Sequence, residues 1–239
     1  MLSKKAIDLI IQFEVGGRAY YDKKLQSPIW AGGESGITIG MGYDCGFVNE
    51  KQFFQDWGNM LTPNFLEPLR KTIGLKGIQA KQMLRGELMQ VKISYNIAYE
   101  VFVKCSVPKY FKITKAIYPE LETLNEDKQG ALVSMVYNRG NKLEGDSRIE
   151  MKRIVEMVKK KEYEGIAEEI ESSKRHWEGK GLDGLVVRRE AEADLIRDEK
   201  LLGVKLFEQI SKAIQDNPTL KEKLVQEVAQ LKKLKKKKD

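Results

Sequence analysis

The sequence predicts an α+β protein that is mostly helical, with one small β-region near the N-terminus. Eight of the 20 glycines lie between Gly16 and Gly46, and the segment Gly36-Ile-Thr-Ile-Gly40 is typical of a short strand between turns. After residue 48, apolar residues recur mainly at helical spacing. No stretch approaches the roughly 18 to 20 consecutive apolar residues of a membrane-spanning helix, which argues against an integral membrane protein.

The first predicted helix begins after Ser3, which we expect to act as its N-cap. Ala6, Leu9, Ile10 and Phe13 follow the spacing of one helix face, and the pattern stops at two consecutive glycines, residues 16 and 17. Residue 14, a glutamate, is therefore expected at the C-terminal end of this helix. Residues 18–47 are expected to form a small irregular sheet or hairpin.

The remaining chain is predicted to be helical. Thr123 and Glu126, like Ser147 and Glu150, have the spacing of a capping box, and Gly140 is expected to end the helix that Thr123 opens. The predicted helices cover about 49–61, 64–72, 78–84, 87–104, 124–138, 148–160, 161–173, 184–201, 203–215 and 218–236.

Cysteine and histidine are scarce. Cys45 and Cys105 are the only cysteines; they are too few for a disulfide framework, and two unpaired buried thiols are the favoured interpretation over a single bridge. His176, the only histidine, is expected to be a surface or packing residue. We expect no metal site and no cofactor. The N-terminus has no apolar segment typical of a signal peptide, so we expect synthesis in the cytoplasm.

The net charge of +7 is concentrated near the C-terminus. Residues 200–239 hold 11 lysines against 5 acidic residues, whereas residues 1–199 hold 31 basic and 30 acidic residues. The lysine-rich end could attract an anionic wall polymer, an anionic membrane surface or nucleic-acid phosphates. The nearly neutral remainder argues against a broad nucleic-acid footprint, and no nucleic-acid partner is expected.

Glu14 is a candidate general acid. A carboxyl group at a helix C-terminus faces the negative end of the helix dipole, and both this field and partial burial favour its protonated form. A protonated acid is what general-acid cleavage of a glycosidic bond requires. Thr38 on the short strand and Asp44 or Asp22 on nearby segments could supply the hydroxyl and the second carboxylate that activate a water. Equally, a glutamate that ends a helix is commonly a simple surface residue.

Three segments in the same order resemble the phage-type lysozymes and endolysins, which are muramidases. They are Phe13-Glu14-x-Gly16-x-x-Ala19-Tyr20 with Thr38-Ile-Gly-x-Gly42, then Ala131-Leu-Val-Ser-Met-Val-Tyr-Asn138-x-Gly140, and finally Gly184-Leu-Val-Val-Arg188-Arg189-x-x-Glu192-Ala-x-Leu195. The resemblance covers about residues 6–196. It implies a lysozyme-like fold, with a small N-terminal β-bearing lobe, a helical C-terminal lobe and a cleft between them. The domain boundary is then expected near residue 199, with a helical lysine-rich extension over 200–239.

The resemblance also implies roles for individual residues. Glu14 would be the general acid, and Thr38 with Asp44 would hold and activate the attacking water. Asn138 and Tyr43 would contact the sugars, Asn138 through their N-acetyl groups. By the same resemblance, Arg188 or Arg189 would pair with the general acid and fix its rotamer, and such a pair would oppose the preference for the protonated form. The alternative for both arginines is an exposed charged helix face.

The position of the second carboxylate departs from the usual phage pattern. In those enzymes an aspartate usually precedes the threonine, nine residues after the glutamate, whereas Asp22 lies eight residues after Glu14 and an insertion over 25–35 separates it from Thr38. The segment Gly42-Tyr43-Asp44-Cys-Gly46 resembles the pesticin-like branch instead, in which the aspartate follows the threonine. Asp44 is therefore favoured and Asp22 is the alternative. Tyr43 also stands where phage enzymes often have a histidine.

Three aromatic residues of the N-terminal region have two interpretations. Tyr20, Tyr21 and Trp30 could stack on sugar rings or fill the small lobe, and packing is favoured for Tyr20.

The predicted function is hydrolysis of the β-1,4 bond between N-acetylmuramic acid and N-acetylglucosamine in bacterial peptidoglycan. The protein is expected to be a monomer that reaches the cell wall by release or delivery. Two alternatives are a lysozyme-like module that binds wall or a partner without cleaving, and an α-helical nucleic-acid-binding protein.

Overall fold

The computed structural model describes residues 2–197, so the helices predicted at 203–215 and 218–236 and the lysine-rich segment lie outside the described residues. Up to Ile196 the chain forms one compact unit. Its α-helices are α1 (Lys4–Val15), α2 (Gly17–Lys24), α3 (Glu50–Trp57), α4 (Pro63–Arg70), α5 (Gly77–Gln82), α6 (Tyr95–Val101), α7 (Val107–Ile117), α8 (Glu126–Arg139), α9 (Ile149–Lys160), α10 (Tyr163–Ser172) and α11 (Asp183–Ile196). The strands are β1 (Ile29–Trp30), β2 (Ile37–Ile39) and β3 (Tyr43–Asp44), and short 3-10 helices cover Cys45–Phe47, Gly86–Gln90, Pro119–Thr123, Asp146–Arg148 and Ser173–His176.

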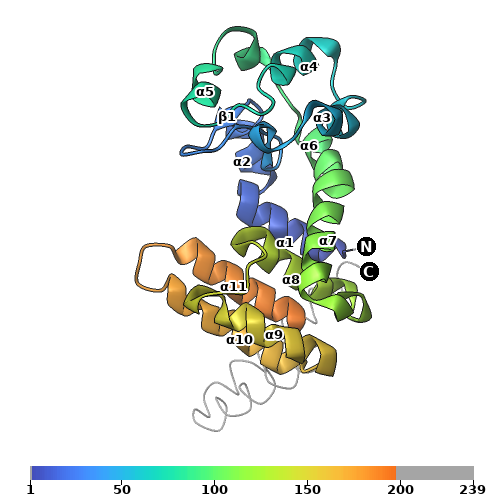
Figure 1. Ribbon diagram of the computed structural model, residues 1–239, viewed down its shortest axis with the longest axis vertical. Helices are drawn as coiled ribbons and strands as arrows, with labels where there is room; N and C mark the ends of the chain where they lie inside the picture. Colours follow the sequence, from blue (N-terminus) through green and yellow to red (C-terminus); the bar gives the residue numbers. More distant parts are fainter. Residues whose placement is uncertain (1, 198–239) are drawn as a thin grey trace, which may run out of the picture. The chain divides into compact units, whose positions relative to one another are not determined.

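The elements form two lobes joined by the continuous stretch of α6 and α7. Figure 1 shows α2, the sheet and α3 to α5 at one end of the molecule, and α8 to α11 at the other. Helix α1 leads from the helical lobe toward α2. This arrangement confirms the predicted lysozyme-like α+β class with a small β-bearing lobe. Within residues 2–197, no helix is long and apolar enough to cross a membrane.

Helix α1 begins and ends as predicted. The Ser3 side chain accepts a hydrogen bond from the Ala6 amide at 3.1 Å, which satisfies one of the free amides of the first turn. At the other end Gly16 adopts a left-handed conformation with φ of 65°, and its amide donates to the carbonyl of Gln12. These two caps place Glu14 in the last turn of the helix.

Helix α2 was not predicted. Two consecutive glycines ordinarily end a helix, and residues 16 and 17 both have positive φ, but the chain resumes a helical path at Gly17. Tyr21 anchors this helix because its ring is fully buried and its hydroxyl donates to the Ile93 carbonyl at 3.1 Å. Arg18 and Asp22 form an i,i+4 ion pair on its surface.

The sheet is antiparallel, with the strand order β1-β2-β3. Ile37 and Ile39 are buried on one face of β2, and Thr38 lies on the opposite face. Thr38 is directly paired with Asp44 of β3. The predicted strand between Gly36 and Gly40 is therefore present, and its register brings two of the candidate site residues onto one face.

The helix predicted over 87–104 is wrong at both ends. Residues 86–90 form a 3-10 helix, and α6 begins only after Ser94, whose side chain accepts from the Ile97 amide at 3.4 Å. After α6 the chain does not stop: the π-helical turn Phe102–Ser106 leads directly into α7. Pro108 follows this π-helical turn closely, within the continuous helical path, where its missing amide interrupts the regular ladder of backbone hydrogen bonds.

Neither predicted capping box forms. Asn125 caps α8 by accepting from the Lys128 amide at 2.9 Å, while the Thr123 hydroxyl donates to the Glu120 carbonyl. Helix α9 has no side-chain cap, because its N-cap residue is Arg148, whose side chain has no acceptor atom; Glu150 is buried and engaged elsewhere. The helices themselves are close to the predicted ranges, and Gly140 does end α8.

Helix α8 is the centre of the helical lobe. Helices α1, α7 and α11 all pack on it, and its residues from 128 to 136 are buried. At the crossing with α1 the backbones approach so closely that an ideal Cβ at Gly130 would lie 2.0 Å from the Cβ of Ala6. Gly130 is therefore required for the contact between these two helices.

We expect Gly130→Ala to lower the free energy of unfolding by about 1–3 kcal/mol, because the overpacking cost exceeds the helix-propensity gain of about 1 kcal/mol. Chemical denaturation measures this change. Gly165→Ala in α10 is the matched control, since its Cβ would meet its nearest neighbour at 3.4 Å, an ordinary contact. Adding Ala6→Gly to Gly130→Ala should recover part of the loss; equal stability of Gly130→Ala and wild type would contradict the close packing.

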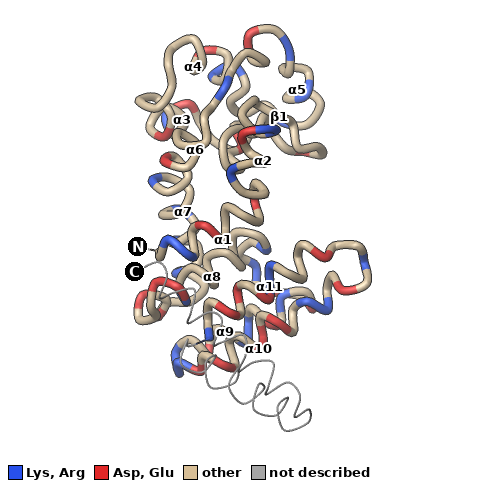
Figure 2. Tube along the Cα trace, turned by 180° about the vertical axis from the view of Figure 1, so that it is seen from behind, with Lys and Arg blue, Asp and Glu red and all other residues tan. Residues whose placement is uncertain are grey.

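The charged residues of the two lobes are mixed in sign. Figure 2 shows lysine and arginine interspersed with aspartate and glutamate along the trace of both lobes. This distribution agrees with the near balance of 31 basic and 30 acidic residues in 1–199.

Candidate active site

The carboxyl group of Glu14 is held by a buried arginine. Arg188 of α11 donates from Nη1 to Glu14 Oε1 at 2.7 Å, and its side chain is 2% exposed whereas that of Glu14 is 22% exposed. The guanidinium also lies 5.6 Å from the centre of the Phe13 ring. The first and last of the three sequence segments thus meet at the end of α1.

Arg188 is itself fixed by α8 and by its own helix. Its Nε donates to Glu192 Oε1 at 3.1 Å, and its Nη2 donates to the Ser134 carbonyl at 3.1 Å. Ser134 Oγ donates to the same Glu192 oxygen at 2.5 Å. The result is a buried chain of charge-assisted bonds from Glu192 to Glu14 that holds the guanidinium in one orientation.

The alternative of an exposed face for the two arginines is wrong. Arg189 is fully buried, pairs with Glu192 at 2.7 Å, and lies 5.6 Å from the centre of the Trp177 ring. Arg139 lies 5.0 Å from the same ring centre, so the indole is contacted by two guanidiniums. The arginine that pairs with the candidate acid is Arg188, not Arg189.

Asp44 is held by backbone amides of the β-bearing lobe. Its Oδ1 accepts from the amides of Gly36 at 3.0 Å and Gly46 at 2.8 Å, and its Oδ2 accepts from Gly36 at 3.1 Å. Gly36 has to be glycine, because an ideal Cβ there would lie 2.3 Å from the backbone nitrogen of Gly46. Since each carboxylate oxygen can accept about two hydrogen bonds, Oδ2 keeps capacity for one further donor such as a water.

Thr38 is the cross-strand neighbour of Asp44. Side chains at such paired positions have Cβ atoms about 5 Å apart, so one water could bridge the hydroxyl and the carboxylate. Within residues 2–197 the Thr38 hydroxyl forms no hydrogen bond, which leaves it available to such a water.

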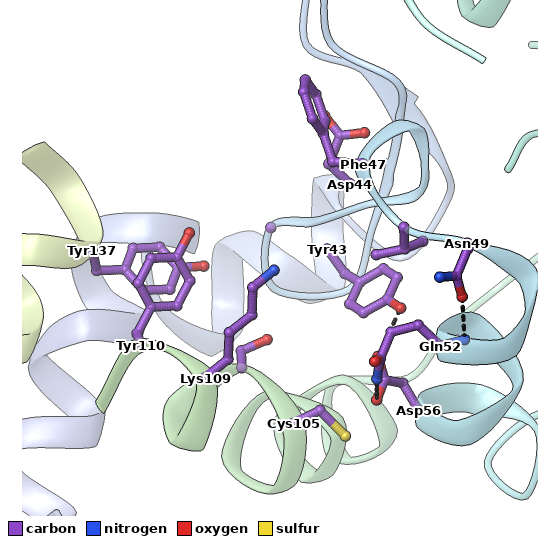
Figure 3. Close-up of a pocket in the computed structure, with 13 residues that line it drawn as sticks. Tyr43, Asp44, Phe47, Asn49, Gln52, Asp56, Cys105, Lys109, Tyr110 and Tyr137 are labelled. Carbon is purple, nitrogen blue, oxygen red and sulfur yellow. Dashed lines mark hydrogen bonds between the residues drawn. The ribbon is translucent and has the colours of Figure 1, made fainter. Parts of the chain in front are cut away.

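Four of the candidate site residues line pockets, two of them in each of two pockets. The larger pocket, of about 530 Å³, is lined by Tyr43 and Asp44 and also by residues of α7 and α8 (Figure 3). The smaller pocket, of about 360 Å³, is lined by Glu14 and Asn138 with the first turn of α11. Asn138 is exposed at the end of α8. Glu14 and Asn138 are thus brought together, as are Tyr43 and Asp44.

Two tyrosines lie near Glu14. Tyr110 and Tyr137 line the larger pocket, with ring centres 4.1 Å apart (Figure 3). Burial raises the pKa of Tyr110 and of Tyr137, and the charge of nearby Glu14 raises the pKa of both further. Tyr137 directly precedes Asn138, which lines the smaller pocket. Sequence reasoning missed Tyr110, while Tyr137 was part of a recognised segment without an assigned role.

Tyr43 has a structural anchor. Its ring packs edge-on against Trp57 at 5.5 Å, and its hydroxyl donates to Asp56 Oδ2 at 2.8 Å. Gln52 Nε2 donates to the other oxygen of Asp56 at 2.9 Å. Burial and this hydrogen bond both raise the pKa of Tyr43, so the phenol is protonated at neutral pH. Asp56 gave no signal in the sequence, because the helical spacing of α3 does not reveal a partner on β3.

Asp22 lies apart from these residues. It is exposed on α2, where it forms an ion pair with Arg18 at 3.5 Å and accepts from Gln26 at 3.4 Å. It lines neither of the two pockets.

The aromatic residues of the N-terminal region differ from one another. Tyr20 is 53% exposed, so packing, the favoured interpretation, is wrong for it. Tyr21 is fully buried. Trp30 is partly buried, donates to the Ser35 carbonyl at 3.1 Å and lies beneath the Lys81 ammonium.

The two cysteines are free thiols, and the histidine contacts a buried carboxylate. Cys45 and Cys105 are both free, the first buried and the second partly buried. Burial raises the pKa of Cys45 to about 12 and that of Cys105 to about 11, so both thiols stay protonated at neutral pH. His176 is 3.3 Å from buried Glu150. Within the part of the chain that the structure describes, no cluster of three or more His, Cys, Asp or Glu side chains is arranged to hold a metal ion.

A carboxyl group on a helix and a carboxylate on a strand, each at a pocket of a lysozyme-like fold, define a candidate glycoside hydrolase. The family model described as phage lysozyme matches residues 33–192, more than half of the chain, and the chain belongs to this family. Membership makes peptidoglycan its substrate class. The matched range contains Thr38, Asp44 and Arg188 and begins after Glu14. A comparison with curated proteins finds no match.

Proposed function

We propose that the protein is an N-acetylmuramidase that cleaves the β-1,4 bond between N-acetylmuramic acid and N-acetylglucosamine. Glu14 donates a proton to the leaving oxygen, and a water held by Asp44 and Thr38 attacks the sugar. The observation that carries this proposal is the 2.7 Å hydrogen bond from buried Arg188 to Glu14. This bond fixes the partly exposed Glu14 carboxyl group at the edge of the smaller pocket.

Each proposed role follows from the hydrogen-bonding atoms of the side chain that are not engaged within the protein. Glu14 Oε1 accepts from Arg188, which leaves Oε2 as the oxygen that carries and donates the proton. Asp44 Oδ2 has one free acceptor position and the Thr38 hydroxyl is free, so the pair can orient one water. Asn138 and the Tyr43 ring would contact the substrate, the first by its amide and the second by its ring.

The preference for Asp44 over Asp22 rests on position and on hydrogen bonding. Asp44 lines a pocket and is held by three backbone hydrogen bonds, whereas Asp22 is exposed and paired with Arg18. Fixed orientation is what a general base needs in order to place a water within hydrogen-bond reach.

We expect Asp44→Asn to lower the rate of peptidoglycan hydrolysis by about 100-fold or more, and Asp22→Asn to leave it within about threefold of wild type. The loss of turbidity of a purified peptidoglycan suspension measures both. Because an amide at position 44 faces two backbone donors, the stability of Asp44→Asn has to be measured as well. Thr38→Val removes the hydroxyl without altering these bonds and should also slow hydrolysis. The opposite order, loss with Asp22→Asn and activity with Asp44→Asn, would move the second carboxylate to α2.

A further inference from the structure

The larger pocket is lined by charged residues from both sides. Tyr43, Asp44 and Asp56 come from the β-bearing lobe, and Lys109 comes from the first turn of α7. Figure 3 shows the Lys109 side chain extending between Tyr110 and Tyr43. The pocket is thus bounded on one side by carboxylates and on the other by an ammonium.

The two carboxylates of this pocket are already engaged. Asp44 accepts three backbone hydrogen bonds, and Asp56 accepts from Tyr43 at 2.8 Å and from Gln52 at 2.9 Å. Lys109 differs, because its ammonium forms no ion pair and no hydrogen bond within residues 2–197. An ammonium has three hydrogen-bond donors, so Lys109 places a positive charge at the pocket whose donors are available to a ligand.

We propose that Lys109 is a specificity-determining residue that binds a carboxylate of the peptide carried by the glycan. The inference rests on the proposed function, because it assumes that the glycan occupies the pocket next to the Tyr110–Tyr137 pair. A β-1,4 glycan of N-acetylglucosamine alone is uncharged, whereas the peptides of peptidoglycan carry free carboxylates. A compact ammonium on a pocket wall distinguishes the two by charge.

The chemistry favours a carboxylate over a sugar hydroxyl as the partner of Lys109. Hydrogen bonds between an ammonium and a carboxylate are roughly twice as strong as those between neutral groups. The pocket offers the Asn49 side-chain amide and the Tyr110 hydroxyl to neutral sugar groups, whereas the Tyr43 hydroxyl and the Gln52 amide already bond to Asp56. The Lys109 ammonium adds a charge-assisted hydrogen bond, which those neutral groups cannot form between themselves and a neutral sugar.

The test measures the KM of wild type and Lys109→Gln on two soluble substrates. One consists of peptidoglycan fragments with intact peptides, and the other consists of the same fragments with their carboxyl groups converted to amides. Lys109→Gln should raise the KM for the intact fragments by about 3- to 10-fold, with the rise confined to that substrate. Lys109→Arg, which keeps the charge, should restore most of the affinity.

Lys112→Gln is the matched control. Lys112 is exposed on the same helix one turn away and does not line this pocket, so the variant should match wild type on both substrates. An equal KM of Lys109→Gln and wild type for intact fragments, or an equal rise on both substrates, would overturn the inference.

A binding measurement tests the carboxylate contact of Lys109 independently of the proposed hydrolysis. The dissociation constant of the intact fragments, measured with Glu14→Gln and with the Glu14→Gln/Lys109→Gln double variant, does not depend on hydrolysis. Weaker binding by the double variant supports the carboxylate contact. If wild type fails to cleave while this difference persists, only the proposed reaction is overturned.

Discussion

Glu14→Gln is expected to lower the rate of peptidoglycan hydrolysis by about 100- to 10,000-fold, the usual range for loss of a general acid. Glutamine keeps the size of the side chain, and its Oε1 can still accept the bond from Arg188. It carries no proton that can be transferred to the leaving oxygen. The loss of turbidity of purified peptidoglycan measures the rate, and the free energy of unfolding should stay close to that of wild type.

The control for this variant is Glu168→Gln on α10. Glu168 is exposed and lines neither candidate pocket, so its variant should lyse as wild type does. Equal lysis by Glu14→Gln and Glu168→Gln would mean that the acid lies elsewhere. Binding of peptidoglycan without lysis by wild type would favour the alternative of a non-catalytic wall-binding module.

Arg188→Met is expected to lower the free energy of unfolding by about 3 kcal/mol, because it leaves a buried carboxylate network without its central cation. Ser134 and Glu192 lose their shared donor, and Glu14 loses the group that fixes its orientation. Hydrolysis should also slow, since a freely rotating acid is less often placed at the leaving oxygen. Chemical denaturation and turbidity measure the two effects.

Two further variants test whether burial and the shape of the guanidinium cause the effect of Arg188→Met. Arg153→Met is the surface control, because the Arg153 side chain is 54% exposed and its pair with Glu169 should be worth less than about 1 kcal/mol. Arg188→Lys keeps the charge but lacks the planar fork that contacts three partners at once, and should be intermediate. A free energy of unfolding for Arg188→Met within 1 kcal/mol of wild type would contradict the role assigned to the network.

Local patterns predicted much of the fold. The Ser3 cap, the glycine that ends α1 and the short strand around Thr38 each depend on neighbouring residues, and each is present. Helix α2 was missed because two glycines look like a stop, although both can adopt the positive φ that lets the chain turn and resume a helix. The boundaries of α6 and α7 depend on tertiary packing, which the helix propensities of the individual residues do not predict.

The predicted capping box of Ser147 and Glu150 failed for a related reason. Glu150 has the correct spacing for a cap, but α9 buries it beside Arg175, Arg139 and His176, whose positions come from distant segments. Tertiary ion pairs thus outcompete a local backbone bond worth about 1 kcal/mol.

Local sequence patterns predicted the parts of the candidate site whose residues are close in the chain, whereas the long-range pairing of an arginine with Glu14 was expected only from the family resemblance. Thr38 and Asp44 lie six residues apart on adjoining strands, so their pairing follows from one tight turn. The Arg188 and Glu192 pair has an i,i+4 spacing that a helix brings together, but nothing local links it to Glu14, 174 residues away. Lys109 carried no signal either, because an exposed lysine on a helix is ordinary.

The most direct test of the muramidase proposal identifies the new reducing ends in digests of purified peptidoglycan. Borohydride reduction followed by acid hydrolysis and mass spectrometry distinguishes reduced muramic acid from reduced glucosamine. The account predicts new reduced muramic acid with wild type and almost none with Glu14→Gln. New reduced glucosamine, or equal amounts of reduced muramic acid from both proteins, would contradict it.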